Sequence, residues 1–193
     1  MAKIETLYPT AMYVEDRIGN FDNVQEEMKE CLKGVKFSFH EGWGTHWLSN
    51  LEFTENTLLQ SMPLFAAELS KHIEAYCNAM KFFDKTYVEI ISSWFSKFKK
   101  GNHAHIHNHK GADISGVYYF KSTGDDGKIF FTTPNQYTEM SDVWSSDRFS
   151  HSSDEGKLLL FPGYLKHGVT TNITSNTRIS FSFNLKVHEW VNE

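Results

Sequence analysis

The segment Arg178-Ile-Ser-Phe-Ser-Phe-Asn-Leu185 alternates between polar and apolar side chains at every position. Successive side chains of a β-strand point to opposite faces of the sheet, so this segment predicts a strand with one polar and one apolar face. The polar face carries Arg178, Ser180, Ser182 and Asn184, and the apolar face carries Ile179, Phe181, Phe183 and Leu185. Such a pattern is expected where one side of a sheet surrounds a wet cavity.

Arg178 needs a partner in such a cavity, because an unpaired buried charge is costly. Its planar fork suits a carboxylate, and the hydroxyl of Ser180 can reach the same carboxylate oxygens. The strand therefore predicts a small anionic ligand. An internal salt bridge with an acidic side chain such as Asp113 or Glu89 is the alternative.

Short runs rich in β-branched and aromatic residues recur in the second half of the chain and predict further strands. With the last strand, they cover residues 87–98, 114–120, 128–132, 158–161 and 178–187. Gly124-Asp-Asp-Gly127 predicts a hairpin turn between two of them. Residues 21–32 and 61–80 have helical periodicity instead, with Ser61 as a cap. Helices followed by strands predict a mainly β fold, an antiparallel barrel or sandwich flanked by N-terminal helices.

A dense histidine run occupies alternate positions, at His103, His105, His107 and His109. If this segment is extended, all four side chains point the same way and form a ligand set for a divalent metal. His167 follows a predicted strand and the Pro162-Gly163 turn, so a neighbouring strand can bring it to the same metal. A solvated polar loop is the alternative for the run.

The chain has 193 residues, which suits a single domain over residues 1–193, with a helical support region at 1–85 and a β core at 86–188. A net charge of −5 argues against a nucleic-acid surface as the main function. Cys31 and Cys77 form no C-x-x-C pair, and no apolar stretch is long enough to span a membrane, so we expect a cytoplasmic protein. Residues 133–154 predict a long loop, either a lid or a disordered segment.

Several of these pieces together resemble the 2-oxoglutarate- and Fe(II)-dependent oxygenases. They are His107-Asn-His109, Ser115-Gly-Val-Tyr-Tyr119, Leu160-Phe-Pro162 before His167, and Arg178-Ile-Ser180. More narrowly, they resemble a prolyl-hydroxylase-like branch found in bacteria and phages, which would place a phage-encoded protein in the host cytoplasm. The resemblance spans roughly residues 87–187.

This resemblance implies a double-stranded β-helix, a jelly-roll or cupin-like barrel, over residues 86–188. It implies Fe(II) bound by His107, His109 and His167, with 2-oxoglutarate held by Arg178 and Ser180. Tyr118 or Tyr119 would line the cosubstrate pocket, and strand parity does not choose between them. The implied activity is a dioxygenase reaction that uses O₂, hydroxylates an unidentified organic substrate and releases succinate and CO₂.

The sequence departs from the wider family at His109, where an Asp or Glu is usual. Spacing favours His109 as the second ligand, and Asp113 is the alternative. Without a carboxylate, iron should be held less tightly and its redox potential should shift. A three-histidine cupin-like dioxygenase or a zinc protein that does not use 2-oxoglutarate explains the histidines equally well but gives Arg178 and Ser180 no role. A non-enzymatic β-domain with incidental histidines is a third reading.

Overall fold

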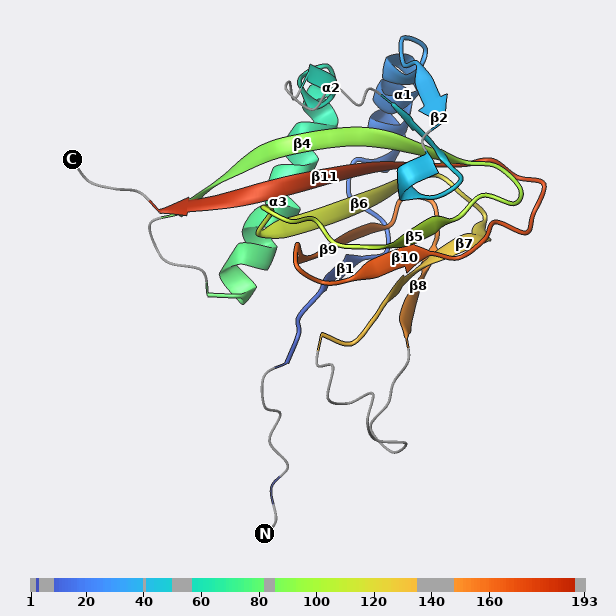
Figure 1. Ribbon diagram of the computed structural model, residues 1–193. Coiled ribbons are helices and arrows are strands. Elements are labelled where there is room, and N and C mark those ends of the chain that lie inside the picture. The colour runs from blue at the N-terminus through green and yellow to red at the C-terminus, as the bar shows by residue number, and fades with distance from the viewer. Residues whose placement is uncertain are drawn as a thin grey trace.

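The computed structural model describes residue 3 and residues 9–39, 41–49, 57–81, 86–134 and 148–189. Two antiparallel sheets form the body of the protein, and the helices lie against one face of the larger sheet (Figure 1). This arrangement is the double-stranded β-helix that the motifs implied, so the predicted fold class is confirmed.

The larger sheet has the strand order β1-β9-β6-β11-β4-β3-β2. Its strands are β1 (Tyr13–Glu15), β2 (Phe37–Phe39), β3 (Trp47–Ser49), β4 (Thr86–Phe98), β6 (Ile114–Lys121), β9 (Leu158–Pro162) and β11 (Arg178–Glu189). The smaller sheet has the order β5-β10-β7-β8. Its strands are β5 (Ala104–His107), β7 (Gly124–Phe131), β8 (Phe149–Ser153) and β10 (His167–Val169).

The helices are α1 (Phe21–Leu32), α2 (Thr57–Gln60) and α3 (Pro63–Ala79), with a short 3₁₀ helix at Glu41–Trp43. The predicted helices at 21–32 and 61–80 are confirmed, but Ser61 does not cap α3, because its hydroxyl donates to the carbonyl of Leu58. The cap comes from α1 instead. The carboxylate of Glu27 accepts hydrogen bonds from the backbone N–H groups of Leu64 and Phe65, at 2.9 and 2.8 Å.

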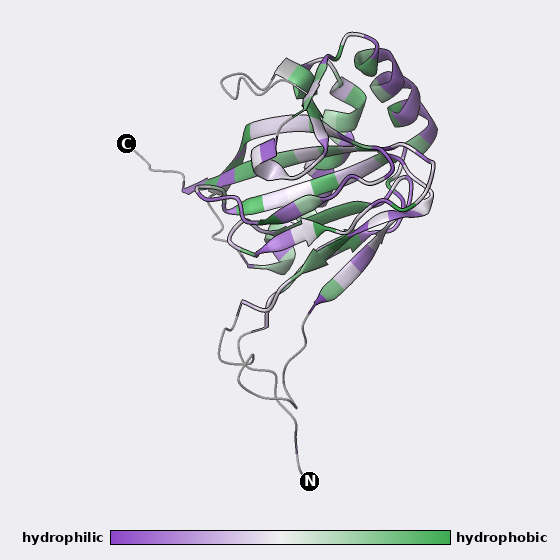
Figure 2. Ribbon diagram, turned by 45° about the vertical axis from the view of Figure 1, so that its right-hand side comes forward, coloured by the Kyte–Doolittle hydropathy of each residue, from purple (hydrophilic) through white to green (hydrophobic). Residues whose placement is uncertain are grey.

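The main core lies between α1, α3 and the larger sheet. Phe181, Phe183 and Leu185, from the apolar face of β11, are fully buried there together with Phe65 and Leu69 of α3. Figure 2 shows this band of hydrophobic residues where the helices meet the strands. Each fully buried side chain of this kind contributes about 1.5–3 kcal/mol by leaving water. The apolar face of β11 thus packs against the helices, and its polar face points into the interior of the barrel.

Three parts of the chain differ from the sequence-based predictions. The N-terminal region supplies strands β1, β2 and β3 as well as helices. Gly124–Gly127 is not a hairpin turn, because β6 and β7 lie in different sheets and these residues begin β7. Within the predicted 133–154 loop, residues 149–153 form β8, and the lid prediction for 135–147 falls outside the described residues.

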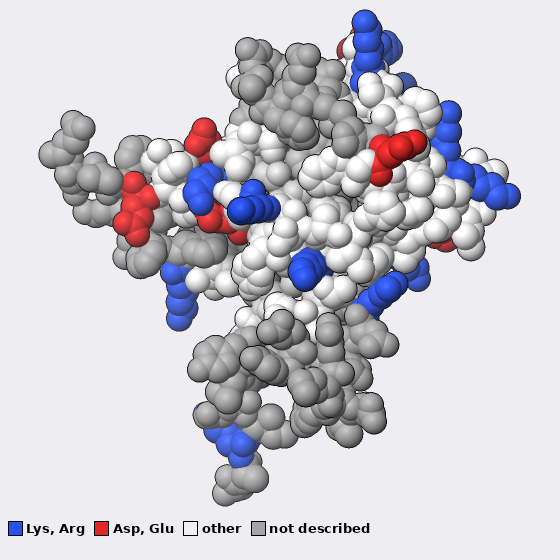
Figure 3. All heavy atoms as spheres, viewed as in Figure 1, with Lys and Arg blue, Asp and Glu red and all other residues white. Residues whose placement is uncertain are grey.

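Basic side chains on the face seen in Figure 3 stand apart from one another, so the described residues of this face form no continuous basic track. Two of the three lysines within residues 97–100 lie over aromatic rings. The ammonium of Lys97 lies 4.0 Å above the ring of Phe37, and that of Lys99 lies 5.4 Å from the ring of Trp47. Among the described helices none is long and apolar enough to cross a membrane.

Candidate metal and cosubstrate site

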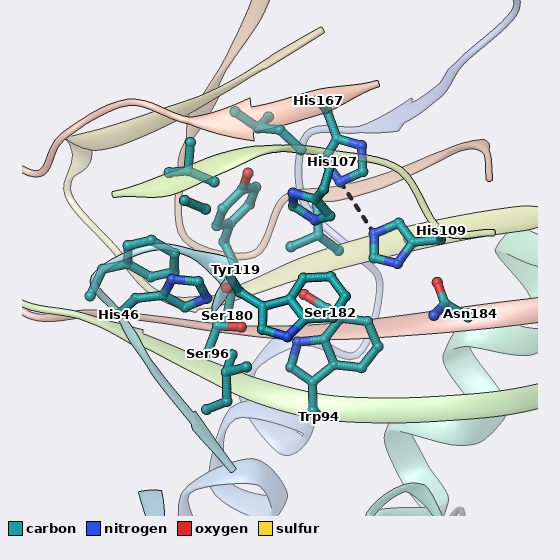
Figure 4. A pocket seen from close by; sticks show the side chains of 18 of the residues that line it. His46, Trp94, Ser96, His107, His109, Tyr119, His167, Ser180, Ser182 and Asn184 are labelled. Atoms are coloured by element: carbon teal, nitrogen blue, oxygen red, sulfur yellow. Dashed lines mark hydrogen bonds between the residues drawn. The ribbon is translucent and has the colours of Figure 1, made fainter. Parts of the chain in front are cut away.

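A cavity of about 170 Å³ lies between the two sheets. The larger sheet lines it with the polar face of β11, formed by Arg178, Ser180, Ser182 and Asn184, and with Ser92, Trp94, Ser96 and Phe98 of β4. The smaller sheet contributes His107 and His167 (Figure 4). The predicted division of β11 into a cavity face and a core face is therefore confirmed.

Three histidines from separate elements converge at one side of this cavity. His107 ends β5, His167 begins β10, and the two are paired across these neighbouring strands. His109 follows two residues after His107. One ligand nitrogen from each of the three lies within 4.8 Å of the others, and the Nε2 atoms of His109 and His167 are 3.3 Å apart. Nitrogens bound about 2.1 Å from one metal at right angles would be about 3 Å apart, so the set fits a divalent cation.

Backbone carbonyls fix the tautomers of two of these imidazoles. Nδ1–H of His107 donates to the carbonyl of His105 at 2.8 Å, and Nδ1–H of His167 donates to the carbonyl of Leu165 at 2.9 Å. Each bond leaves Nε2 with a free lone pair, which is the arrangement that metal-binding histidines need.

Burial keeps the triad in its neutral, metal-binding form. Burial, and then the neighbouring imidazoles, lower the pKa of His109 to about 3. The same causes lower the pKa of His167 to about 4, and burial lowers that of His107. No protons have to be removed from these side chains at neutral pH before a metal binds.

The histidine run is not extended over its whole length. Strand β5 ends at His107, and neither His103 nor His105 lines the cavity. The ring of His103 lies 3.2 Å from the hydroxyl of Thr45, and His105 is exposed. The prediction that all four histidines share one face is therefore wrong, because the pairing of β5 with β10 is irregular between His107 and Ala104, which breaks the alternation of the strand.

Neither Asp113 nor Glu89 forms a salt bridge with Arg178, and Asp113 does not lie beside the three histidines. Asp113 does not lie among the cavity residues, because its carboxylate binds Nζ of Lys186 at 3.0 Å and the backbone N–H of Val187 at 2.9 Å. Glu89 pairs with His188 at 2.8 Å. Neither acidic residue is therefore available to Arg178, and Asp113 is not brought to the triad.

Arg178 is the buried cation of the cavity, with only 1% of its surface exposed. Nη1 donates to the carbonyl of Gly127 at 2.7 Å, and the guanidinium lies 4.0 Å from the centre of the Phe98 ring. Nε has no hydrogen-bond partner, and among the described residues no carboxylate lies within ion-pair distance of this guanidinium. Burial lowers the pKa of Arg178, but a guanidinium stays charged in proteins. The nearby buried Asp126 and Tyr119 oppose this lowering of the pKa, but among the described residues no carboxylate contacts the guanidinium, so the site offers a cation that can still bind an anion.

The pairing of β6 with β11 separates the two candidate tyrosines. Tyr119 lies opposite Ser180 and lines the cavity, whereas Tyr118 lies opposite Phe181 in the helix-covered core. The hydroxyl of Tyr118 accepts a hydrogen bond from Gln25. A cosubstrate role for Tyr118 is therefore excluded by its position. Burial raises the pKa of Tyr119 to about 12, so this residue remains a neutral hydrogen-bond donor.

Sequence reasoning missed His46, which is 5% exposed and lines the same cavity. Its ring stacks on Phe98 with 4.4 Å between centroids, and Nδ1–H donates to the carbonyl of His103 at 3.2 Å. Burial lowers the pKa of His46 to about 4. No periodic pattern marks this histidine, since it lies in a short connection before β3.

Two indoles and an amide complete the wall near the triad. Ring centroids of Trp94 and His109 are 5.8 Å apart, and those of Trp43 and His107 are 5.6 Å apart. Asn184 donates to Ser92 and accepts from Ser115, both at 2.9 Å. Figure 4 shows Asn184 on the far side of His109 from Ser180 and His46.

Part of the chain matches one family model in sequence, and many solved structures are similar to the chain in fold. A family model described as "Putative 2OG-Fe(II) oxygenase" matches residues 92–184. None of the curated protein sequences is significantly similar to the chain. The matched segment contains the triad, Tyr119, Arg178 and Ser180, so the family match confirms the resemblance that the motifs indicated.

Three solved structures illustrate the likeness. A prolyl-4-hydroxylase from Pseudomonas putida has a TM-score of 0.63 at 13% identity, with 91% of this chain and 92% of that chain covered. HygX from Streptomyces hygroscopicus, solved with nickel and 2-oxoglutarate, has a TM-score of 0.63 at 12% identity and coverages of 91% and 82%. A prolyl hydroxylase from Trichoplax adhaerens has a TM-score of 0.64 at 11% identity and coverages of 90% and 82%.

At these identities the structural matches show the fold alone. The sequence match covers the part of the chain that carries the three converging histidines and the buried arginine. Through residues 92–184, the chain is similar to the 2OG-Fe(II) oxygenase family.

Proposed function

We propose that this protein is an Fe(II)- and 2-oxoglutarate-dependent oxygenase in which His107, His109 and His167 hold the metal and Arg178 and Ser180 hold the cosubstrate. The observation that supports it most strongly is the presence, within one cavity, of three neutral imidazoles and a buried guanidinium that, among the described residues, no carboxylate contacts. The reaction hydroxylates an organic substrate, with one oxygen atom of O₂ entering the product and the other entering succinate as CO₂ is released.

Each residue of the site has its own role in binding and orienting the cosubstrate. Arg178 binds the far carboxylate of 2-oxoglutarate through its bidentate fork, and the Ser180 hydroxyl and the neutral Tyr119 hydroxyl donate to the same end. This contact orients the keto-acid end of the cosubstrate toward the triad. Aromatic walls exclude water from the reacting groups. Fe(II), when bound, supplies the activation of O₂, which side chains alone cannot provide.

A three-histidine metal protein that does not use 2-oxoglutarate remains the second candidate function. It accounts for the histidines, but it leaves the buried charge of Arg178 without a ligand. We therefore favour the 2-oxoglutarate enzyme. The primary substrate is not identified, and we also infer a single domain, a cytoplasmic location and a phage or bacterial origin from the sequence.

Anaerobic titration with Fe(II) and 2-oxoglutarate tests this function. Chelation of the keto acid by the metal should produce a weak charge-transfer band in the visible spectrum. Arg178→Ala should weaken cosubstrate binding, and His167→Ala should abolish the band. His105→Ala is the matched control, because His105 belongs to the same histidine run but lies outside the cavity. Absence of the band in the wild-type protein at saturating iron and 2-oxoglutarate would rule out the proposed function.

A further inference from the structure

The Gly124–Gly127 segment lies directly behind Arg178. It is not the turn that its sequence indicated, and the proposed function gives it no role. The carbonyl of Gly127 accepts the hydrogen bond from Nη1 of Arg178 at 2.7 Å. This is the hydrogen bond by which the described protein holds the guanidinium, so the position of the Gly127 carbonyl sets where the cation points.

The neighbouring Asp126 has an unusual environment for a carboxylate, because it is completely buried and forms no ion pair with the described residues, although its charge raises the pKa of the nearby Arg178. One oxygen accepts hydrogen bonds from the hydroxyls of Ser122 and Ser153, at 2.5 and 2.9 Å. The other accepts from the backbone N–H of Thr123 at 3.0 Å, while the hydroxyl of Thr123 donates to Asp125 at 2.7 Å. Three neutral donors satisfy the carboxylate of Asp126 and tie the start of β7 to β8.

On the side away from Asp126, Gly127 packs closely against Thr170. Its φ of +108° is a conformation that suits glycine, and a Cβ there would lie 2.8 Å from the carbonyl of Thr170 and 3.3 Å from Nη1 of Arg178. The backbone N–H of Lys128 donates to the hydroxyl of Thr170 at 2.8 Å. The carbonyl that holds Arg178 is therefore fixed by Asp126 from one direction and by the β10 end from the other.

We propose that Asp126 is a positioning residue for the cosubstrate, acting through the Gly127 carbonyl on Arg178. The buried carboxylate fixes the first residues of β7, and these residues direct the remaining N–H groups of Arg178 into the cavity. Asp126 touches no ligand itself. This inference rests on the proposed function, since it needs Arg178 to bind the far carboxylate of a keto acid.

The test compares Asp126→Asn with Asp125→Asn, which removes the same charge from the exposed neighbouring side chain. Anaerobic binding to the Fe(II)-loaded protein is measured for 2-oxoglutarate and for 2-oxobutyrate, which lacks the far carboxylate. Asp126→Asn should weaken 2-oxoglutarate about tenfold, as for loss of one charge-assisted hydrogen bond, and leave 2-oxobutyrate unchanged. Asp125→Asn should match the wild type. The double variant Asp126→Asn/Arg178→Ala should bind 2-oxoglutarate no more weakly than Arg178→Ala alone.

Several outcomes would overturn the inference. They are wild-type affinity in Asp126→Asn, tighter binding as if an opposing charge had been removed, equal losses for both keto acids, or additive effects in the double variant. If Asp126→Asn does not fold, Ser153→Ala removes one of the three hydrogen bonds to Asp126 and should weaken 2-oxoglutarate binding selectively by a smaller factor. A wild-type protein that binds no 2-oxoglutarate would contradict the proposed function, whereas binding without any effect of Asp126 contradicts only this inference.

Discussion

At the scale of single residues, His109 sets the proposed metal site apart, because it would supply an imidazole where the oxygenases that the motifs resemble usually have a carboxylate. Three neutral ligands leave the full charge of a divalent metal uncompensated, and imidazole suits iron, nickel, copper and zinc alike. Loss of a residue that hydrogen-bonds a metal ligand lowers metal affinity by roughly 10- to 100-fold. We predict that His109→Ala, which removes a proposed ligand itself, lowers Fe(II) affinity by more than this. Anaerobic calorimetric titration measures this change. His105→Ala serves as the control, and equal affinities in the two variants would remove His109 from the ligand set.

Residue positions could be predicted where one strand determines them. The alternation in β11 was enough to place Arg178 and Ser180 on the cavity face. Choosing between Tyr118 and Tyr119 required the pairing of β6 with β11, because residues directly opposite each other share a face. That pairing is a long-range property and leaves no mark within the Tyr-Tyr dipeptide. The exposed position of His105 likewise depends on the irregular pairing of β5 with β10.

At the scale of elements, α3 is tied to the start of α1 by Glu68, which is only 5% exposed. Its carboxylate binds Nζ of Lys71 at 2.6 Å and packs so closely on Gly19 that a Cβ there would lie 2.6 Å from Oε1. The bond with Lys71 lowers the pKa of Glu68 from 4.5, against the opposing effect of burial. A lowered carboxyl pKa stabilises the folded state above the unfolded value, and this stabilisation is lost as the pH falls through the folded value.

We therefore predict that Glu68→Gln destabilises the protein by about 1–2 kcal/mol at pH 7, through loss of the charged hydrogen bond. The difference from wild type should shrink as the pH falls below 4.5 and through the lowered pKa of the folded carboxylate, which then becomes protonated. Urea unfolding over this pH range and at pH 7 measures it. Glu30→Gln breaks an exposed ion pair of the same spacing, with Lys33, and should have almost no effect. A pH-independent difference for Glu68→Gln would mean that shape rather than charge matters here.

Long elements could be predicted from the sequence, and short ones could not. Helices α1 and α3 and strands β4, β6, β9 and β11 have enough residues for their periodicity to be recognised. Strands β1, β2 and β3 have three residues each. Strands β1 and β3 pair with the longer strands β9 and β4, and β2 pairs with β3. The Gly124–Gly127 segment resembles a hairpin turn in composition, but its chain crosses from one sheet to the other, and composition does not carry that information.

At the scale of the whole molecule, the cavity lies between two sheets, so a ligand that contacts both should stabilise the entire barrel. The triad comes from β5, β10 and the residues after β5, whereas Arg178 comes from β11 of the other sheet. Metal alone should therefore stabilise mainly the smaller sheet, and 2-oxoglutarate with metal should link the two. Binding at 100 times Kd stabilises the folded state by about 2.7 kcal/mol.

For a chain of this length, each kcal/mol raises Tm by about 2–4 °C, so Fe(II) with 2-oxoglutarate should raise Tm by about 5–10 °C in anaerobic scanning calorimetry. Arg178→Ala should keep the increase that Fe(II) alone produces and lose the further increase from 2-oxoglutarate, because the triad lies on a different sheet from the arginine. A wild-type Tm that responds to metal but not to 2-oxoglutarate would instead favour the three-histidine protein that does not use the keto acid. A Tm that responds to neither would mean that the converging imidazoles bind no metal.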